Sequence, residues 1–399
     1  MATKPQLAVG LDVGSSRTRV VACAVEDGHL RYLSHGLAPS GGWNKGRIVD
    51  GQAVADSIAA ALADAERDAG ITIESATIGI GGAGVQGAQG RGLCQFGRPR
   101  EVDESDLRYA AEAAADVRLE HDRTLLHVFP QDFVLDGLGG YRKPQKSLCS
   151  RLEANVHLVT TQTQEYESVV QAAHEAHVVV EEVVFEPVAQ AYGALLPEER
   201  SRGVALLDIG LQSSSLVVYD GDACVLATGL PISADHFTRD IGYVFKVSYE
   251  DAEALKQQYG CAITGLTAES TLIEIPMADG RPSREAKRYE LVETLEARAE
   301  QLFDMVHTEI RRANMDRKLF EGILLSGGGA LLNGMCDMAE RILNCSASNA
   351  LVKGIGEWPD NLDSPVWTCA AGLAMYSAKL KLHRPAKRAG AGLLSLVMR

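Results

Sequence analysis

An aspartate followed by a glycine turn and hydroxyl residues occurs twice in this chain, about half its length apart. The first set is Asp12, Gly14, Ser15, Ser16 and Arg17, and the second is Asp208, Gly210, Gln212 and Ser213. Each set lies between apolar, strand-like segments, where glycine lets backbone N–H groups approach phosphate oxygens and the hydroxyls donate further hydrogen bonds. Because aspartate repels phosphate, we expect Asp12 and Asp208 to hold a hydrated Mg²⁺. The repetition predicts a phosphate clamp divided between two domains.

Two further patterns fit a nucleotide. Gly327, Gly328 and Gly329 follow an apolar run and allow the backbone to lie flat against a planar base, although a tight strand-to-helix turn also uses such residues. Glu253 and Lys256 share one face of an expected helix. They form either a solvated salt bridge or a pair that binds ribose hydroxyls.

Composition argues against several functional classes. The net charge of −14 opposes non-specific nucleic-acid binding, because neutralising phosphates requires a basic surface. The eight cysteines are scattered singly, without the spacing of a metal site or a disulfide framework. The start lacks a signal-peptide pattern and no apolar run approaches ~18 residues, so we expect a protein of the reducing cytosol.

The expected elements follow one another as in an α/β protein. A meander, a helix and a further strand are expected over residues 7–11, 18–25, 30–37, 51–69 and 76–80. A compact insert follows, in which Asp103 begins a helix with Asp106 three residues on. Its strands are expected over residues 123–129, 132–135 and 155–160. The segment 231–315 then reads as charged helices.

Small residues in two helix-like segments, 186–193 and 368–375, would let two helices cross closely. With the phosphate turns and the glycine-rich turn, they make the chain resemble the actin, sugar-kinase and DnaK superfamily. Within it the chain is similar to the FtsA family, on the motifs at residues 126–133, 154–160, 239–242 and 251–260. The resemblance implies an α/β, actin-like two-lobed ATPase fold with RNase H-like mixed sheets and an inserted 1C subdomain.

The resemblance also implies a division of the chain. The units are subdomain 1A (1–82 and 159–202), the insert 1C (83–158), subdomain 2A (203–230 and 316–380), subdomain 2B (231–315), and a basic linker with an amphipathic membrane-targeting tail (381–399).

ATP and Mg²⁺ would then occupy a cleft between the lobes. The resemblance implies that Gly327 and Gly328 line adenine and that Glu253 and Lys256 reach ribose. Catalysis would involve Asp208 and Glu186, with Glu186 orienting an attacking water.

Two features bear on hydrolysis. Glu186 could instead only balance the positive end of a helix. In the second turn, Leu211 and Gln212 stand where relatives commonly carry glycines. We therefore expect nucleotide binding with slow or absent hydrolysis.

The function implied is that of a cell-division protein that polymerises and tethers the FtsZ ring to the inner face of the cytoplasmic membrane, recruiting other divisome components. The C-terminal peptide of FtsZ would bind 2B, attracted by basic residues. These candidates are Arg281, Arg284, Lys287, Arg288, Arg311 and Arg312. The basic, then apolar tail would bind anionic lipid at the division site.

Two other functions remain open from the residues. A pilus-assembly scaffold resembling PilM would share the actin-like fold and bind a membrane partner's peptide. A small-molecule kinase of the same superfamily would need a substrate pocket with a catalytic aspartate, and the sequence offers no convincing candidate.

Overall fold

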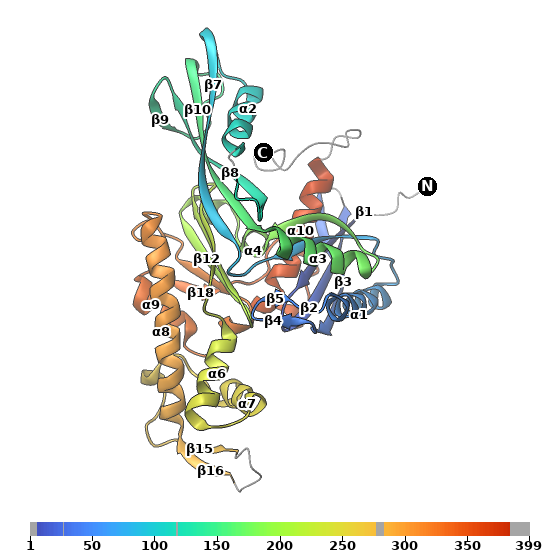
Figure 1. The fold of residues 1–399 in the computed structure, drawn as a ribbon, viewed down its shortest axis with the longest axis vertical. Helices are drawn as coiled ribbons and strands as arrows, with labels where there is room; N and C mark the ends of the chain where they lie inside the picture. Colours follow the sequence, from blue (N-terminus) through green and yellow to red (C-terminus); the bar gives the residue numbers. More distant parts are fainter. Residues whose placement is uncertain (1–5, 27, 117–118, 277–282, 384–399) are drawn as a thin grey trace.

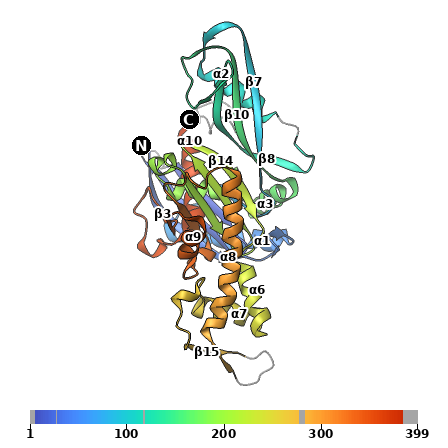
Figure 2. The ribbon, with the colours of Figure 1, turned by 90° about the vertical axis from the view of Figure 1, so that its left-hand side faces the viewer.

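The computed structural model describes residues 6–26, 28–116, 119–276 and 283–383. Two sheets lie side by side at the centre of an elongated molecule (Figure 1). A β-rich insert and a helical unit occupy opposite ends of the long axis (Figure 2). The N-terminal sheet with its helices is called the first lobe below, and the second sheet with the helical unit is called the second lobe.

The first lobe is built on a six-stranded sheet with the order β11-β6-β1-β2-β3-β19. β1, β2 and β3 form the expected antiparallel meander, and β6 and β11 continue the sheet in parallel. The strands are β1 (Gln6–Val13), β2 (Arg17–Glu26), β3 (His29–Pro39), β6 (Ser75–Ile80), β11 (Val179–Phe185) and β19 (Ile355–Gly356). Its helices are α1 (Gly51–Ala69), α3 (Thr163–Glu175), α4 (Glu186–Ala194), α5 (Pro197–Ser201) and α10 (Thr368–His383).

The second sheet repeats this arrangement. Its order is β14-β13-β12-β17-β18, in which three antiparallel strands are followed by two parallel ones. The strands are β12 (Val204–Ile209), β13 (Ser214–Asp220), β14 (Ala223–Leu230), β17 (Ile323–Ser326) and β18 (Ala347–Asn349). The duplicated order is the RNase H-like topology that the family resemblance implied, and it places β1 and β12 at equivalent positions.

A helical unit extends from the second sheet. Its apolar side chains continue the core of that sheet, so the two parts pack as one body. The elements are α6 (Ala234–Phe245), α7 (Tyr249–Tyr259), β15 (Leu272–Ile275), β16 (Arg284–Lys287) and α8 (Arg288–Arg312), with α9 (Met335–Leu343) against the sheet. The helix expected to carry Glu253 and Lys256 forms as α7.

The insert has its own four-stranded sheet and its own core. Its elements are β7 (Gln86–Glu101), α2 (Glu104–Ala115), β8 (Arg123–Leu135), β9 (Leu138–Tyr141) and β10 (Leu148–Gln162). Asp103 and Asp106 form the expected capping box at the start of α2. The expectation of two separate strands at 123–129 and 132–135 is wrong, because β8 continues through Pro130 at a register shift beside β10.

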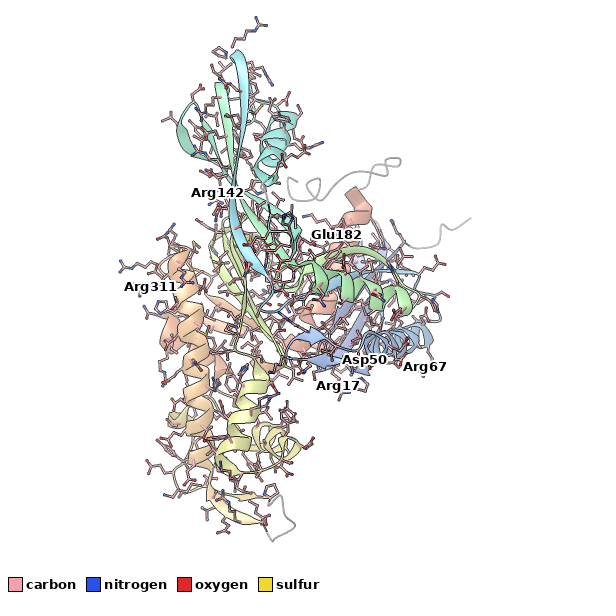
Figure 3. All side chains as sticks on the ribbon, in the orientation of Figure 1. Arg17, Asp50, Arg67, Arg142, Glu182 and Arg311 are labelled. Carbon is pink, nitrogen blue, oxygen red and sulfur yellow. The ribbon has the colours of Figure 1, made fainter. Side chains whose placement is uncertain are left out.

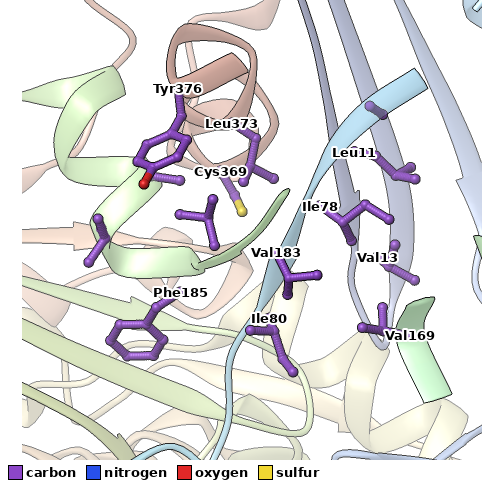
Figure 4. Close-up of a cluster of buried hydrophobic side chains, with 14 of the residues drawn as sticks. Leu11, Val13, Ile78, Ile80, Val169, Val183, Phe185, Cys369, Leu373 and Tyr376 are labelled. Atoms are coloured by element: carbon purple, nitrogen blue, oxygen red, sulfur yellow. The ribbon is translucent and has the colours of Figure 1, made fainter. Parts of the chain in front are cut away.

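The small-residue helices α4 and α10 cross beneath the two lobes. A Cβ on Gly372 of α10 would lie 2.0 Å from the backbone oxygen of Ala189 on α4, so the close approach requires glycine. Around this crossing, Cys369, Leu373 and Tyr376 of α10 pack with side chains of β6 and β11 (Figure 4). The same core includes buried residues of β12 and β13, which joins the lobes at the crossing.

The end of α10 bears on the expected C-terminal tail. The helix runs to His383, so the first three residues of the expected linker, 381–383, are helical. Lys381 is fixed there by an ion pair with Glu181, with its Nζ 2.7 Å from the carboxylate oxygen. The rest of the tail lies outside the described residues. Among the described residues no helix is long and apolar enough to span a membrane.

Short elements complete the fold. They are β4 (Trp43–Asn44), β5 (Arg47–Ile48) and the 3₁₀ turns Thr264–Leu266, Gly328–Leu331, Asp360–Leu362 and Pro365–Trp367. β4 and β5 pair as a small hairpin whose turn includes Gly46, next to the second lobe.

Candidate functional site

The two aspartate-glycine turns occupy equivalent positions in the two lobes. One joins β1 to β2 and the other joins β12 to β13, each with a tight antiparallel register. A Cβ on Gly14 would lie 2.9 Å from the Arg17 backbone oxygen, and one on Gly210 would lie 2.8 Å from that of Ser213. Both turns therefore need glycine for the same geometric reason.

A cavity of about 710 Å³ lies between the lobes and is lined by both turns. It also reaches the glycine-rich turn after β17 and the helices α4 and α7. The predicted site residues that line it are Asp12, Gly14, Ser15, Ser16, Arg17, Glu186, Asp208, Gly210, Ser213, Glu253, Lys256, Gly327, Gly328 and Gly329. Segments that are distant in the sequence thus converge on one hollow of a size suited to a small-molecule ligand.

Gln212 is the predicted site residue that is absent from the cavity lining. Its side-chain oxygen accepts a hydrogen bond from the Gly46 backbone N–H at 2.9 Å, and its own N–H donates to Ser15 Oγ at 3.2 Å. Gln212 therefore connects the second turn to the first lobe. The side chain that departs from the usual glycine makes an interlobe contact.

Three carboxylates gather where the two turns meet. Burial raises the pKa of Asp12, and burial together with the charge of Asp12 raises the pKa of Asp208 to about 7. Burial and the charges of both aspartates raise the pKa of Glu186 well above its ordinary value. A Cβ on Gly81 would lie 2.2 Å from Glu186 Oε2, so glycine makes room for this carboxylate. The cluster has an excess of negative charge that a cation would relieve.

The donor set fits a hydrated Mg²⁺. Ligand atoms of Asp12, Glu186 and Cys369 lie within 4.8 Å of one another, while Asp208 acts on the same group through its charge. Carboxylate oxygens suit Mg²⁺, which keeps several waters and uses few protein ligands. The thiol of Cys369 is a poor partner for this hard cation, and burial raises the pKa of Cys369 well above its usual range. Asp12, Asp208 and Glu186 are therefore the residues that would hold it.

The glycine-rich turn closes another side of the cavity. Gly327 has φ of +79°, and a Cβ there would lie 2.4 Å from Asp208 Oδ1. Nothing lies within 4 Å of the position that a Cβ would take on Gly328. The turn thus combines tight packing against β12 at Gly327 with an open backbone surface at Gly328, where a flat ring could lie.

Glu253 and Lys256 of α7 form a salt bridge and also line the cavity. Lys256 Nζ lies 2.7 Å from Glu253 Oε2 and 2.7 Å from Thr238 Oγ1. Thr238 Oγ1 donates to the same carboxylate at 2.6 Å. The ion pair is held by Thr238 of α6 and lines the cavity. A salt bridge and a pair that binds ribose hydroxyls, the two alternatives from the sequence, are therefore compatible.

Sequence reasoning missed several lining residues. Arg19 lies two residues after Arg17 on β2, and its guanidinium is 3.7 Å from Asp12 Oδ2. Alternate residues of a strand share a face. Because Arg17 was predicted to bind phosphate, Arg19 could have been predicted to face the same site. Gln190 follows Glu186 by one helical turn, a signal of the same kind. The hairpin residues Trp43 and Arg47 carried no local signal, because tertiary packing brings them to the cavity.

Comparisons with known proteins agree with this architecture. The family model "Cell division protein FtsA" matches residues 205–372, and "SHS2 domain inserted in FTSA" matches residues 82–160. FtsA of Pseudomonas aeruginosa is 31% identical over 93% of this chain and 89% of its own length. FtsA of Borreliella burgdorferi is 32% identical over 93% of this chain and 90% of its own length.

Solved structures match in fold at lower identity. The PilM-PilN type IV pilus biogenesis complex matches with a TM-score of 0.66 and 18% identity, covering 93% of this chain and 98% of that chain. MreB5 of Spiroplasma citri bound to AMPPNP matches with a TM-score of 0.56 and 14% identity, covering 95% and 98%. These likenesses show the expected actin-like ATPase fold. Because these two FtsA proteins are each more than 30% identical to the chain over 93% of its length, this chain belongs to the FtsA family.

Proposed function

We propose that this chain is an ATP-binding, actin-like cell-division protein that polymerises and tethers the FtsZ ring to the inner face of the cytoplasmic membrane. One observation carries the nucleotide part of the proposal. Asp12 and Asp208, on equivalent strands of the two lobes, are both buried beside phosphate-type turns that line the same cavity. In a chain of the FtsA family, this arrangement is best suited to Mg²⁺-ATP.

The geometry suggests how ATP lies in the cavity. Phosphate oxygens would accept hydrogen bonds from the two turns, and Arg19 adds positive charge near Asp12. Adenine would lie against Gly328, and ribose would approach Glu253 and Lys256. Mg²⁺, when bound, would neutralise phosphate charge, and the predicted ligands Asp12 and Asp208, together with Glu186 beside them, would hold it. The fold neighbour MreB5 is bound to AMPPNP in its structure, which supports a nucleotide as the ligand of this fold.

We expect hydrolysis to be slow or absent. In the second turn, Leu211 and Gln212 stand where relatives commonly carry glycines, and their side chains limit how closely the backbone can approach a γ-phosphate. Gln212 is also engaged in the contact between the lobes. A steady-state ATPase assay tests this expectation, and turnover of ~1 to 1,000 per second, typical of efficient enzymes, would contradict it.

The helical unit of the second lobe is the proposed site for the FtsZ C-terminal peptide. The basic candidates form two separate groups. Lys287 and Arg288 stand at the start of α8, whereas Arg311 and Arg312 end it. Figure 3 shows Arg311 at that end of the helix. A helix of 25 residues is ~37 Å long, so a short peptide segment would use one group. Arg281 lies outside the described residues.

Some of these cations are already engaged within the protein. Arg288 Nε donates to the Tyr259 backbone oxygen at 2.8 Å, and Arg312 forms an ion pair with Glu309. Lys287→Glu and Arg311→Glu therefore test the two groups separately. Weaker, salt-dependent peptide binding in one variant alone would identify the group, and unchanged binding in both would remove the electrostatic role.

The membrane part of the proposal depends on the C-terminal segment. Residues 384–399 follow the end of α10 and combine basic residues with an apolar end. Cations near an anionic surface contribute ~1 kcal/mol each, and apolar side chains add burial at the interface. Weak anchoring of one protomer suits a protein that polymerises, because linked contacts act together. The proposed position is peripheral, on the cytoplasmic face at the division site.

Flotation of labelled FtsZ with anionic liposomes and ATP tests the tether. The full chain should carry FtsZ to the vesicles, and a version ending at Ala386 should not, while remaining folded. If neither protein carries intact FtsZ, the tether is excluded. Binding to a peptide of an inner-membrane pilus protein would then favour a PilM-like scaffold, the alternative that the fold likeness permits.

A further inference from the structure

Gln190 is a buried glutamine with an unused acceptor beside the carboxylate cluster. It lies on α4, one helical turn after Glu186, and lines the cavity between the lobes. The residue is 1% exposed, and among the described residues its Oε1 has no hydrogen-bond partner. Leaving a buried acceptor unpaired is energetically costly, so such an atom calls for a ligand or a water.

The other end of the same amide is engaged. Burial raises the pKa of Asp208, and a hydrogen bond from the Gln190 side chain opposes that rise. A carboxylate accepts hydrogen bonds, so the group that faces it is the Gln190 amide nitrogen. The atom of the amide that has no partner is its acceptor oxygen.

The chemistry of the cavity limits what could donate to Gln190 Oε1. Phosphate oxygens are acceptors and cannot pair with another acceptor. The proposed ribose site is on α7, at Glu253 and Lys256. Water bound to a divalent cation is a strong donor, and Asp12, Glu186 and Asp208 are the groups that would hold such a cation. A neutral amide adds an acceptor there without a fourth negative charge.

We propose that Gln190 is a positioning residue whose Oε1 accepts a hydrogen bond from a water in the hydration shell of the divalent cation. This inference rests on the proposed Mg²⁺-ATP function. Gln190 links that shell to Asp208 on one lobe and to the helix crossing through α4. Gly372 of α10 approaches this segment so closely that a Cβ there would lie 3.0 Å from the Gln190 backbone nitrogen. Metal binding is thereby connected to the relative position of the crossing helices α4 and α10.

The test compares Gln190→Met with Gln190→Glu in the full-length protein. Methionine keeps the length of the side chain but removes the acceptor, whereas glutamate keeps an acceptor and adds charge. Gln52→Met on the exposed face of α1 is the matched control. Binding of fluorescent ATP is titrated with excess Mg²⁺ and again with EDTA, and Mn²⁺ binding is followed by electron paramagnetic resonance. Thermal unfolding checks that each variant is folded.

We expect Gln190→Met to reduce the Mg²⁺ enhancement of ATP binding by about five- to tenfold and to weaken Mn²⁺ binding, with metal-free ATP affinity within about twofold. Gln190→Glu should bind Mn²⁺ at least as tightly as the unsubstituted protein. An unchanged Mg²⁺ enhancement in Gln190→Met overturns the inference while ATP binding stands. If that variant does not fold, weakened Mn²⁺ binding by Gln190→Glu overturns it. If the unsubstituted protein binds no nucleotide, the proposed function fails, and the inference fails with it.

Discussion

Gln212 Oε1 accepts a hydrogen bond from the Gly46 backbone N–H at 2.9 Å, although 166 residues separate them. The backbone N–H of Gln212 also donates to Ser15 Oγ at 3.2 Å. One residue of the second lobe thus contacts both the first phosphate-type turn and the β4-β5 hairpin. If a nucleotide between the lobes is released by their separation, contacts of this kind must break.

Gln212→Ala should therefore speed the release of ATP. Loss of one side-chain hydrogen bond is worth about 0.5–1.5 kcal/mol, which corresponds to a roughly two- to tenfold faster dissociation rate if the contact breaks on opening. Stopped-flow displacement of labelled ATP measures that rate. Gln52→Ala, which removes an exposed amide bonded to Asp56 on α1, is the control and should change nothing. An unchanged rate in Gln212→Ala would show that this bond does not limit opening.

Gly372→Ala should destabilise the crossing of α4 and α10. The added Cβ would lie 2.0 Å from the Ala189 backbone oxygen, and backbone cannot yield as a flexible side chain does. Overpacking of this kind costs about 1–3 kcal/mol, more than the roughly 1 kcal/mol by which alanine favours a helix over glycine. Urea unfolding measures the difference. Gly97→Ala is the matched control because no atom lies within 4 Å of its added Cβ, and equal stability of the two variants would contradict this account.

The sequence predicted an element correctly where the residues of that one segment are enough to determine its structure. The periodicity over residues 51–69 and the Asp103–Asp106 capping pair produced helices where expected. β7 was not expected, because its 16 residues are rich in glycine and polar side chains. This segment forms a strand because it pairs with β10, whose apolar residues contribute to the core of the insert. Pairing between distant strands cannot be read from the composition of one of them.

The same distinction applies to the site. The turns at Gly14 and Gly210 were readable because each needs glycine within its own few residues. Gln212 was expected among the ligand-binding residues, whereas the structure places its side chain on Gly46 of the other lobe. Nothing near Gln212 in the sequence identifies that partner. The acceptor of Gln190 was equally hidden, since burial and the direction of the amide follow from the packing of α4.

Two buried histidines should make the protein less stable in acid. Burial lowers the pKa of His127 and of His157 to about 4. His127 Nε2 accepts a hydrogen bond from the Phe185 backbone N–H at 2.9 Å, which requires the neutral ring. A histidine whose folded-state pKa is lowered contributes stability above its unfolded pKa near 6.5 and loses it as pH falls toward 4.

Each histidine should account for a loss on the order of 3 kcal/mol over that range. The free energy of unfolding in urea, measured between pH 7.5 and 4.5, gives the slope. His127→Gln should flatten it, although the variant starts from lower stability at neutral pH, while the exposed His29→Gln should leave it unchanged. A slope that persists in both His127→Gln and His157→Gln would assign the acid sensitivity to other groups.

Lys256→Met should reduce the preference for ATP over 2′-deoxy-ATP. Lys256 lines the cavity and is held by Glu253 and Thr238, so its ammonium group is ordered before a ribose arrives. Losing a hydrogen bond between this pair and a ribose hydroxyl should weaken ATP binding by about five- to tenfold and leave 2′-deoxy-ATP nearly unaffected. Lys246→Met is the control, because Lys246 packs over Tyr243 and is absent from the cavity lining. If the unsubstituted protein binds both nucleotides equally, or Lys256→Met keeps the preference, then Lys256 serves only the ion pair that joins α7 to α6.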